Sequence, residues 1–201
     1  MTQRRLGNHC LVVHAHPVSE SFNTALRNSV VEGLLAAGNQ VRSVDLYAEG
    51  FEPVLSDQEW TSQLDLPSTR PDFTKHVEHL RWCNHLVLIY PTWWSSTPAM
   101  LKGWFDQIWV NDALSTHPSA TVNIPSRLDN VERLSVVTTH GSGLIRNYLQ
   151  GFGGKRMILR GLRSLCSRQC RTDWIAMYHL DTSTLRQRTS FMKKVQSRLA
   201  P

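Results

Sequence analysis

A continuous apolar run, His85–Tyr90 (HLVLIY), constrains the fold of this chain more than any other feature. A strand with one solvated face alternates apolar and polar residues, whereas an unbroken run is typical of a strand buried on both faces. Such strands occur in parallel sheets that helices cover on both sides. The run therefore indicates an α/β protein with a buried parallel sheet.

Other short runs with strand character alternate with helical patterns along the chain. The expected strands are Cys10–Ala15, Val41–Leu46, His85–Tyr90, Leu134–Thr139 and Trp174–Tyr178. The expected helices are Phe22–Ala37, Phe73–Trp82, a helix capped by Ser96 or Thr97 that ends near Trp109, and Thr184–Leu199. This order predicts a flavodoxin-like, five-stranded parallel sheet with helices on both faces. Because a typical domain has roughly 100–200 residues, we expect one domain over residues 1–201.

Charge is spread unevenly along the chain. Residues 1–154 carry 11 basic and 14 acidic side chains, whereas residues 155–201 carry 11 basic and 2 acidic ones, a net charge of +9. A basic block of this kind attracts anions such as phosphorylated small molecules. It lacks the interleaved aromatic residues of a single-strand or RNA binder, so we expect no nucleic-acid partner. Part of the block is expected to face a bound anion, and the rest to be a solvated surface.

Composition excludes several classes of protein. Apolar residues make up 41% of the chain and charged residues 19%, which is typical of a globular protein. No apolar run approaches the roughly 18 residues of a membrane span, and Leu11–Val13 is too short for a signal peptide. The four cysteines show no C-x-x-C spacing, so we expect free thiols and a reducing, cytoplasmic compartment.

Ligands of open parallel sheets bind beyond the carboxyl ends of the strands, where this sequence places three unusual loops. The first loop, His16–Asn23, has neither G-x-G-x-x-G nor the P-loop spacing. It offers hydroxyls, an amide and an imidazole around a helix N-terminus, which suits either a phosphate group or simple N-capping. His14 and His16 could share one side of a strand, but without a third ligand we expect no metal site.

The second and third loops are rich in aromatic and in small residues respectively. Pro91–Pro98 holds Trp93 and Trp94 at the end of a buried strand, where they suit an aromatic shelf for a flat ring, a lid over the core or an interface. Thr138–Gly143 combines hydroxyl donors with glycines that let backbone approach a ligand closely.

Taken together, four motifs resemble the flavin-dependent NAD(P)H:quinone oxidoreductases of the DT-diaphorase type and their bacterial relatives. The motifs are HAHP-x3-SFN at 14–23, DLY-x3-F-x-P at 45–53, P-x-WW-x3-PA-x-LKGW-x-D at 91–106 and TTHG at 138–141. The resemblance implies a flavodoxin-like fold, bound FAD or alternatively FMN, NAD(P)H as co-substrate and a quinone-like acceptor. It also implies a homodimer whose flavin site lies partly between the chains.

The resemblance carries the family's flavin-binding positions onto this sequence. The first loop corresponds to the segment around the flavin phosphates and ribityl chain, and the other two correspond to segments along the isoalloxazine. The cofactor-binding residues expected on this basis are His16, Ser21, Phe22, Asn23, Pro91, Thr92, Trp93, Trp94, Thr138, Thr139, His140 and Gly141.

Two departures from the family concern catalysis. His140 stands where the family usually has glycine, and Gly153 falls where DT-diaphorase has a histidine that assists hydride transfer. Tyr148 is close to the place of the family's tyrosine, and our hypothesis is that His140 or Tyr148 supplies the missing acid. The implied activity is two-electron transfer from NAD(P)H through flavin N5 to a quinone. Reduction of azo or nitro compounds and a regulatory flavoprotein subunit, as in potassium-efflux systems, are the alternatives.

Overall fold

The computed structural model describes residues 8–57, 71–108 and 128–199. Its sheet has five parallel strands in the order β2-β1-β3-β4-β5, which is the flavodoxin-like order and confirms the predicted fold class. The strands are β1 (His9–His14), β2 (Gln40–Asp45), β3 (His85–Pro91), β4 (Arg133–Thr139) and β5 (Arg171–Met177).

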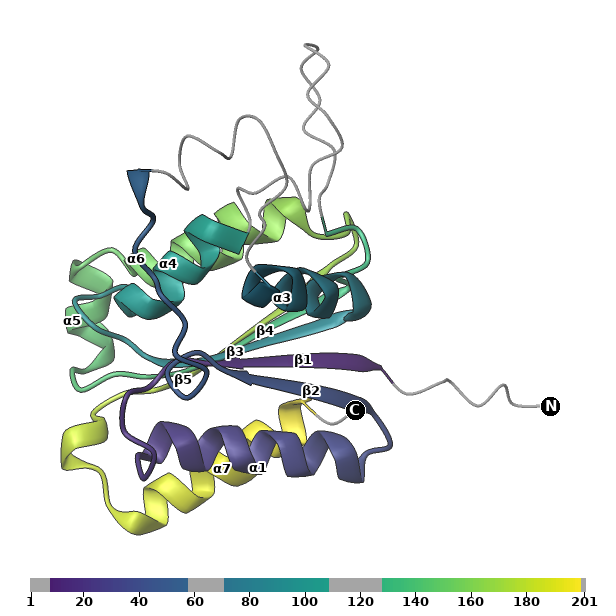
Figure 1. Ribbon diagram of the computed structural model, residues 1–201. Coiled ribbons are helices and arrows are strands. Elements are labelled where there is room, and N and C mark those ends of the chain that lie inside the picture. Colours follow the sequence, from purple (N-terminus) through teal and green to yellow (C-terminus); the bar gives the residue numbers. More distant parts are fainter. Residues whose placement is uncertain (1–7, 58–70, 109–127, 200–201) are drawn as a thin grey trace.

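Helices cover both faces of this sheet (Figure 1). The helices are α1 (Phe22–Ala36), α3 (Pro71–Trp82), α4 (Ala99–Ile108), α5 (Leu144–Leu149), α6 (Gly153–Arg156) and α7 (Leu185–Leu199), with short helical turns η2 (Met157–Gly161), η3 (Leu162–Leu165) and η4 (Leu180–Thr182). Helices α1 and α7 lie on one face, and α3, α4 and α6 on the other. None of the helices in the described ranges is long and apolar enough to cross a membrane.

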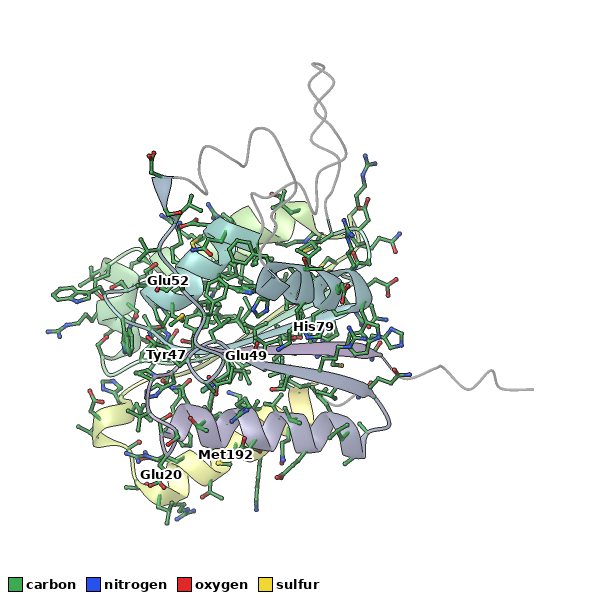
Figure 2. All side chains as sticks on the ribbon, in the orientation of Figure 1. Glu20, Tyr47, Glu49, Glu52, His79 and Met192 are labelled. Atoms are coloured by element: carbon green, nitrogen blue, oxygen red, sulfur yellow. The ribbon has the colours of Figure 1, made fainter. Side chains whose placement is uncertain are left out.

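The core consists of two apolar clusters, one on each side of the sheet. Every residue of β3 is buried, as its apolar run predicts, and successive side chains enter opposite clusters. Leu88 joins the cluster under α3 and α4, whereas Ile89 joins the cluster under α1 and α7. Met192 of α7 packs against the second cluster, where α7 meets α1 (Figure 2).

Local signals in the sequence explain where α1 begins and ends. The Ser21 hydroxyl accepts a 3.1 Å hydrogen bond from the Thr24 backbone N–H, which caps the first turn. The helix ends at Ala36, and Gly38 then adopts a φ of +81°, a conformation that favours glycine. The expected end of the helix at Ala37 is therefore displaced by one residue.

The strand order places a topological switch between β1 and β3. The chain leaves β1 for α1 on one face of the sheet and leaves β3 for α4 on the other. The two loops therefore diverge at the carboxyl ends of neighbouring strands and leave a crevice between them, which is the usual ligand position in such sheets.

Candidate functional site

A cavity of about 460 Å³ occupies this crevice. That volume falls within the range of roughly 300–1,000 Å³ that is common for small-molecule sites. Nine of the twelve residues expected to bind a cofactor line it, and two further residues complete the wall. The lining residues are His16, Ser21, Phe22, Asn23, Pro91, Thr92, Trp93, Thr139, Gly141, Leu180 and Asp181.

Asn23 gives the cavity an unusual polar atom. Its side chain is only 2% exposed, and its Nδ2 donates a 2.8 Å hydrogen bond to Thr139 Oγ1. Its Oδ1 has no hydrogen-bond partner among the described residues. An unsatisfied buried acceptor costs about 1–3 kcal/mol, so this residue of the cavity lining carries an acceptor that a donor could still stabilise.

The N-terminus of α1 opens at the same wall. The first backbone N–H groups of a helix lack acceptors within the helix, and the helix dipole favours an anion there. Phe22 and Asn23 occupy these first positions, and both line the cavity. The Arg188 guanidinium of α7 lies 5.9 Å from the centroid of the Phe22 ring. Arg188, a cation of the C-terminal basic block, therefore lies beside the end of α1 that favours an anion.

Two tight-turn residues shape the second loop. Trp94 and Ser95 have φ values of 49° and 60°, and paired hydrogen bonds of 3.1 and 3.0 Å join Trp93 to Ser96 across them. Two consecutive residues with positive φ are typical of the type I′ turn that closes a two-residue hairpin, a conformation that is uncommon for residues other than glycine, asparagine and aspartate. Trp93 lines the cavity, with its ring centroid 6.3 Å from that of His16. Trp94 points outward and is fully exposed, so the structure does not bring it to the cavity.

Strand alternation divides the third loop between the two faces of the sheet. Thr139 faces α1 and lines the cavity, whereas Thr138 and His140 are buried behind the lining and contact the Thr92 hydroxyl. The Asp181 carboxylate lies against Gly141, so a Cβ atom at Gly141 would push this exposed side chain aside. The third loop and the segment after β5 therefore meet at the cavity.

His140 lies directly behind the cavity wall. It is 3% exposed, its Nδ1 is 2.8 Å from Asn147 Oδ1, and its Nε2 is 3.3 Å from the hydroxyl of Thr92. The Tyr178 ring stacks on it at a centroid distance of 4.7 Å. Burial lowers the pKa of His140 below its ordinary value, although the hydrogen bond with Asn147 opposes this, so the ring is neutral at pH 7.

The remaining catalytic candidate is not among the residues that line the cavity. Tyr148 is 72% exposed on α5, where its ring contacts Phe152 edge to face. Gly153 has a packing role, since a Cβ atom there would lie 3.2 Å from the Ser95 carbonyl oxygen. The backbone N–H of Gly154 donates a 3.0 Å hydrogen bond to that same oxygen. A histidine side chain at position 153 would therefore press on the tryptophan loop.

Neither histidine of the HAH segment joins a metal cluster. His14 is buried, with its Nδ1 3.0 Å from Asp45 Oδ2, and the His16 ring contacts the backbone of Val18. Within residues 8–57, 71–108 and 128–199, no three histidine, cysteine or acidic side chains gather as a metal site would require.

Sequence reasoning missed Leu180 and Asp181, which line the cavity from η4. Both follow β5 and so satisfy the same carboxyl-end rule that identified the other loops. That rule was the available signal, because no residue motif marks this segment.

Comparison with known proteins agrees with this geometry. Residues 8–198 match the family described as having a flavodoxin-like fold. The chain is 30% identical to NAD(P)H dehydrogenase (quinone) 1 of Rattus norvegicus over 80% of its own length and 64% of that protein's. It is 32% identical to human ribosyldihydronicotinamide dehydrogenase (quinone) over 51% of each chain. The chain thus spans between about half and two thirds of the length of these relatives.

A solved structure resembles nearly the whole chain. Smu.1420 of Streptococcus mutans UA159 superposes with a TM-score of 0.80 at 26% identity, covering 95% of this chain and 98% of the other. The family match, the strand order and the relatives agree with one another. The chain therefore belongs to the family with the flavodoxin-like fold and is a homologue of the NAD(P)H:quinone oxidoreductases.

Proposed function

We propose that the chain binds a flavin, FAD or alternatively FMN, in the cavity and transfers two electrons from NAD(P)H to a quinone. The observation that carries this proposal is the convergence of the three loops on one cavity at the switch point, with the buried Asn23 Oδ1 unpartnered in its wall. The homology to NAD(P)H:quinone dehydrogenases supports the same activity.

The residues present fit a flavin. The N-terminus of α1, flanked by Arg188, suits a phosphate group, and Trp93 offers an aromatic surface to a flat ring. Asn23 and the Gly141 backbone supply polar atoms along the wall. When bound, the flavin supplies hydride chemistry that no protein side chain provides.

The chain's own residues bind and orient the reactants. The Asn23–Thr139 hydrogen bond fixes two walls of the cavity relative to each other, so the polar groups are in place before a ligand enters. Pro91 is buried at the end of β3 and lines the cavity, so the site borders directly on the buried strand. The acceptor is expected to enter the pocket that the nicotinamide leaves.

A second copy of the chain is part of this proposal. A monomer would expose a large apolar surface to water at Trp94 and on α5. The exposed residues there are Trp94, Leu144, Ile145, Tyr148 and Leu149. Burial of these side chains between two copies in a homodimer would remove them from solvent. We also propose a cytoplasmic location, in keeping with the free cysteines among the described residues.

A regulatory flavoprotein is the second candidate. Its support is that Gly153 leaves no side chain where DT-diaphorase has a catalytic histidine, and that Tyr148 stands outside the cavity. Such a protein would bind flavin and nucleotide without rapid turnover.

One experiment separates these functions. The purified protein is examined for a flavin absorption spectrum, then mixed with NADH or NADPH without oxygen, and finally given a quinone or an azo compound. Bleaching followed by recovery with the quinone supports the quinone reductase, and faster recovery with the azo compound supports the azoreductase alternative. A yellow protein that neither nucleotide bleaches supports the regulatory candidate. A chain that neither carries nor takes up flavin contradicts both functions. Mass spectrometry of the released cofactor distinguishes FAD from FMN.

A further inference from the structure

His140 is buried, polar and shared between two segments, and the proposed function gives it no task. It contacts Asn147 of α5 on one side and Thr92 of the cavity wall on the other. The family's usual glycine at this position could make neither contact. A buried histidine with both ring nitrogens engaged has a defined tautomer, and that tautomer can be deduced from its partners.

The partners of Asn147 allow only one orientation of its side-chain amide. Its Nδ2 lies 2.8 Å from the carbonyl oxygen of Gly143, and it also lies 3.0 Å from the hydroxyl of Ser142. A carbonyl oxygen can only accept, so the amide nitrogen must face it and Oδ1 must face His140. Because Asn147 Oδ1 is also only an acceptor, the proton of the neutral ring resides on His140 Nδ1.

The tautomer of His140 fixes the hydroxyl of Thr92. With its proton on Nδ1, the neutral ring has a bare lone pair on Nε2, which accepts a hydrogen bond from the Thr92 hydroxyl. Thr92 Oγ1 is also 2.9 Å from Thr138 Oγ1. Since the only hydroxyl proton of Thr92 is already donated, Thr138 must be the donor in that contact.

The surroundings of His140 keep this arrangement in place. The rings of Tyr178 and Trp174 pack against it at centroid distances of 4.7 and 6.5 Å, and neither carries a charge at neutral pH. Among the described residues, no acidic side chain shifts the pKa of His140, and burial is the main cause of its lowered pKa. The neutral ring, with one donor and one acceptor nitrogen, is therefore the state that the fold favours.

We propose that His140 is a positioning residue that accepts a hydrogen bond from the Thr92 hydroxyl and leaves Thr92 able only to accept a hydrogen bond from a ligand in the cavity. The ligand class that fits presents an N–H or O–H group to Thr92, and a carbonyl or a bare ring nitrogen does not fit. An oxidised isoalloxazine carries such an N–H in its imide group. In naming a flavin as the ligand, this inference rests on the proposed function.

The first test uses the wild-type protein without cofactor. The tautomer of His140 is read at pH 7 from the nitrogen-15 shifts and couplings of histidine-labelled protein, with His140 assigned through its contacts to the Tyr178 ring. A proton on Nδ1 is expected. A proton on Nε2, or a doubly protonated ring, would overturn the inference whether or not the protein binds a flavin.

The second test is a double-mutant cycle read by titration with FMN and FAD. Thr92→Val removes the hydroxyl at nearly constant shape, and His140→Phe keeps the stacking on Tyr178. Loss of one hydrogen bond raises the Kd about two- to tenfold, so each single variant is expected to fall in that range. If His140 acts through Thr92, the double variant binds no more weakly than the weaker single variant.

The cycle has two control variants. Thr172→Val, at an exposed position of β5, and His9→Phe, at the start of β1, make the same chemical changes away from the cavity and are expected to leave the Kd unchanged. Effects of Thr92→Val and His140→Phe that multiply independently in the double variant would assign His140 a merely structural role. If the wild-type protein takes up neither flavin, the proposed function fails, and the tautomer alone decides the inference about Thr92.

Discussion

The Asn23 side-chain amide donates a 2.8 Å hydrogen bond to the Thr139 hydroxyl, which joins two loops that lie 116 residues apart in the sequence. The same amide keeps its oxygen buried and unpartnered in the cavity wall. Asn23 thus serves both the shape of the cavity and its chemistry, and substitutions there test both.

Asn23→Asp is expected to weaken flavin binding about tenfold or more. The substitution replaces the donor to Thr139 with a second acceptor, and it places a carboxylate beside the helix end proposed to hold phosphate. The measurement is the Kd for FMN and FAD by fluorescence titration of the cofactor-free protein. Gln187→Glu adds the same charge at the exposed start of α7 and serves as the control. Equal affinity in Asn23→Asp and wild-type protein would contradict the assignment of the first loop.

Gly103→Ala is expected to destabilise the fold by about 3 kcal/mol. Gly103 belongs to α4, and a Cβ atom there would overlap the Pro53 backbone and lie 2.7 Å from its Cα. Backbone atoms cannot move aside as a flexible side chain can. Gly161→Ala is the matched control, because nothing lies within 4 Å of its Cβ position. That control is expected to raise stability by up to about 1 kcal/mol through reduced freedom of the unfolded chain. Urea unfolding measures both, and equal effects would show that α4 does not pack on Pro53.

Stability is expected to fall as the pH drops from about 6.5 to 3, with His85 contributing. Its Nε2 is 2.9 Å from the Ser135 hydroxyl in the core, and burial lowers its pKa to about 3 from an ordinary 6.5. Above pH 6.5 the ring is neutral in both states. Below pH 6.5 the histidine ring binds a proton in the unfolded chain but not in the folded chain. The free energy of unfolding therefore falls by up to about 1.4 kcal/mol per pH unit.

The variant His85→Gln tests this contribution. Glutamine can still donate to Ser135 but does not titrate, so the decline in unfolding free energy between pH 6.5 and 4 is expected to be shallower than in the wild type. The measurement is urea unfolding at several pH values. His9→Gln, at a partly exposed position of β1, is the control. A slope unchanged in His85→Gln would show that His85 takes up no proton on unfolding.

Trp94→Asn is expected to leave folding intact and weaken self-association. Asparagine tolerates the positive φ of this position, and no core contact is lost because the Trp94 side chain is fully exposed. If a second copy covers Trp94, removal of so large a side chain from an interface costs about 2 kcal/mol, or roughly thirtyfold in the dimer Kd. Analytical ultracentrifugation measures this. Leu185→Asn, exposed on α7, is the control, and an unchanged dimer Kd in Trp94→Asn would exclude Trp94 from the interface.

The sheet could be predicted because a strand that is buried on both faces has a continuous run of apolar residues. The apolar run of β3 and the periodic patterns around it determine the element order, and Gly38 marks the end of α1. The observed strand boundaries differ from the predicted ones where the hydrogen bonds between strands continue beyond the apolar residues. Arg171 begins β5 three residues before the predicted Trp174, because it pairs with Arg133 of β4.

The site was predictable as a set of loops but not atom by atom. The carboxyl-end rule indicates that Thr138, Thr139 and His140 lie near a ligand, but the phase of β4 decides which of them face it. That phase depends on packing against both clusters. Trp94 points outward from a turn in which its φ is positive. Tryptophan gives no sign of a positive φ, as a glycine or an asparagine would. Asp181 reaches the cavity through η4, whose turn depends on tertiary contacts.

The close approach of Gly153 to the Ser95 carbonyl couples two positions of this chain during evolution. A Cβ atom at position 153 would lie 3.2 Å from that carbonyl oxygen, so a side chain there requires the Trp94–Ser95 turn to shift by a few tenths of an ångström. A histidine gained at position 153 would therefore be accompanied by an adjustment of the aromatic loop. The two positions are expected to vary together rather than independently.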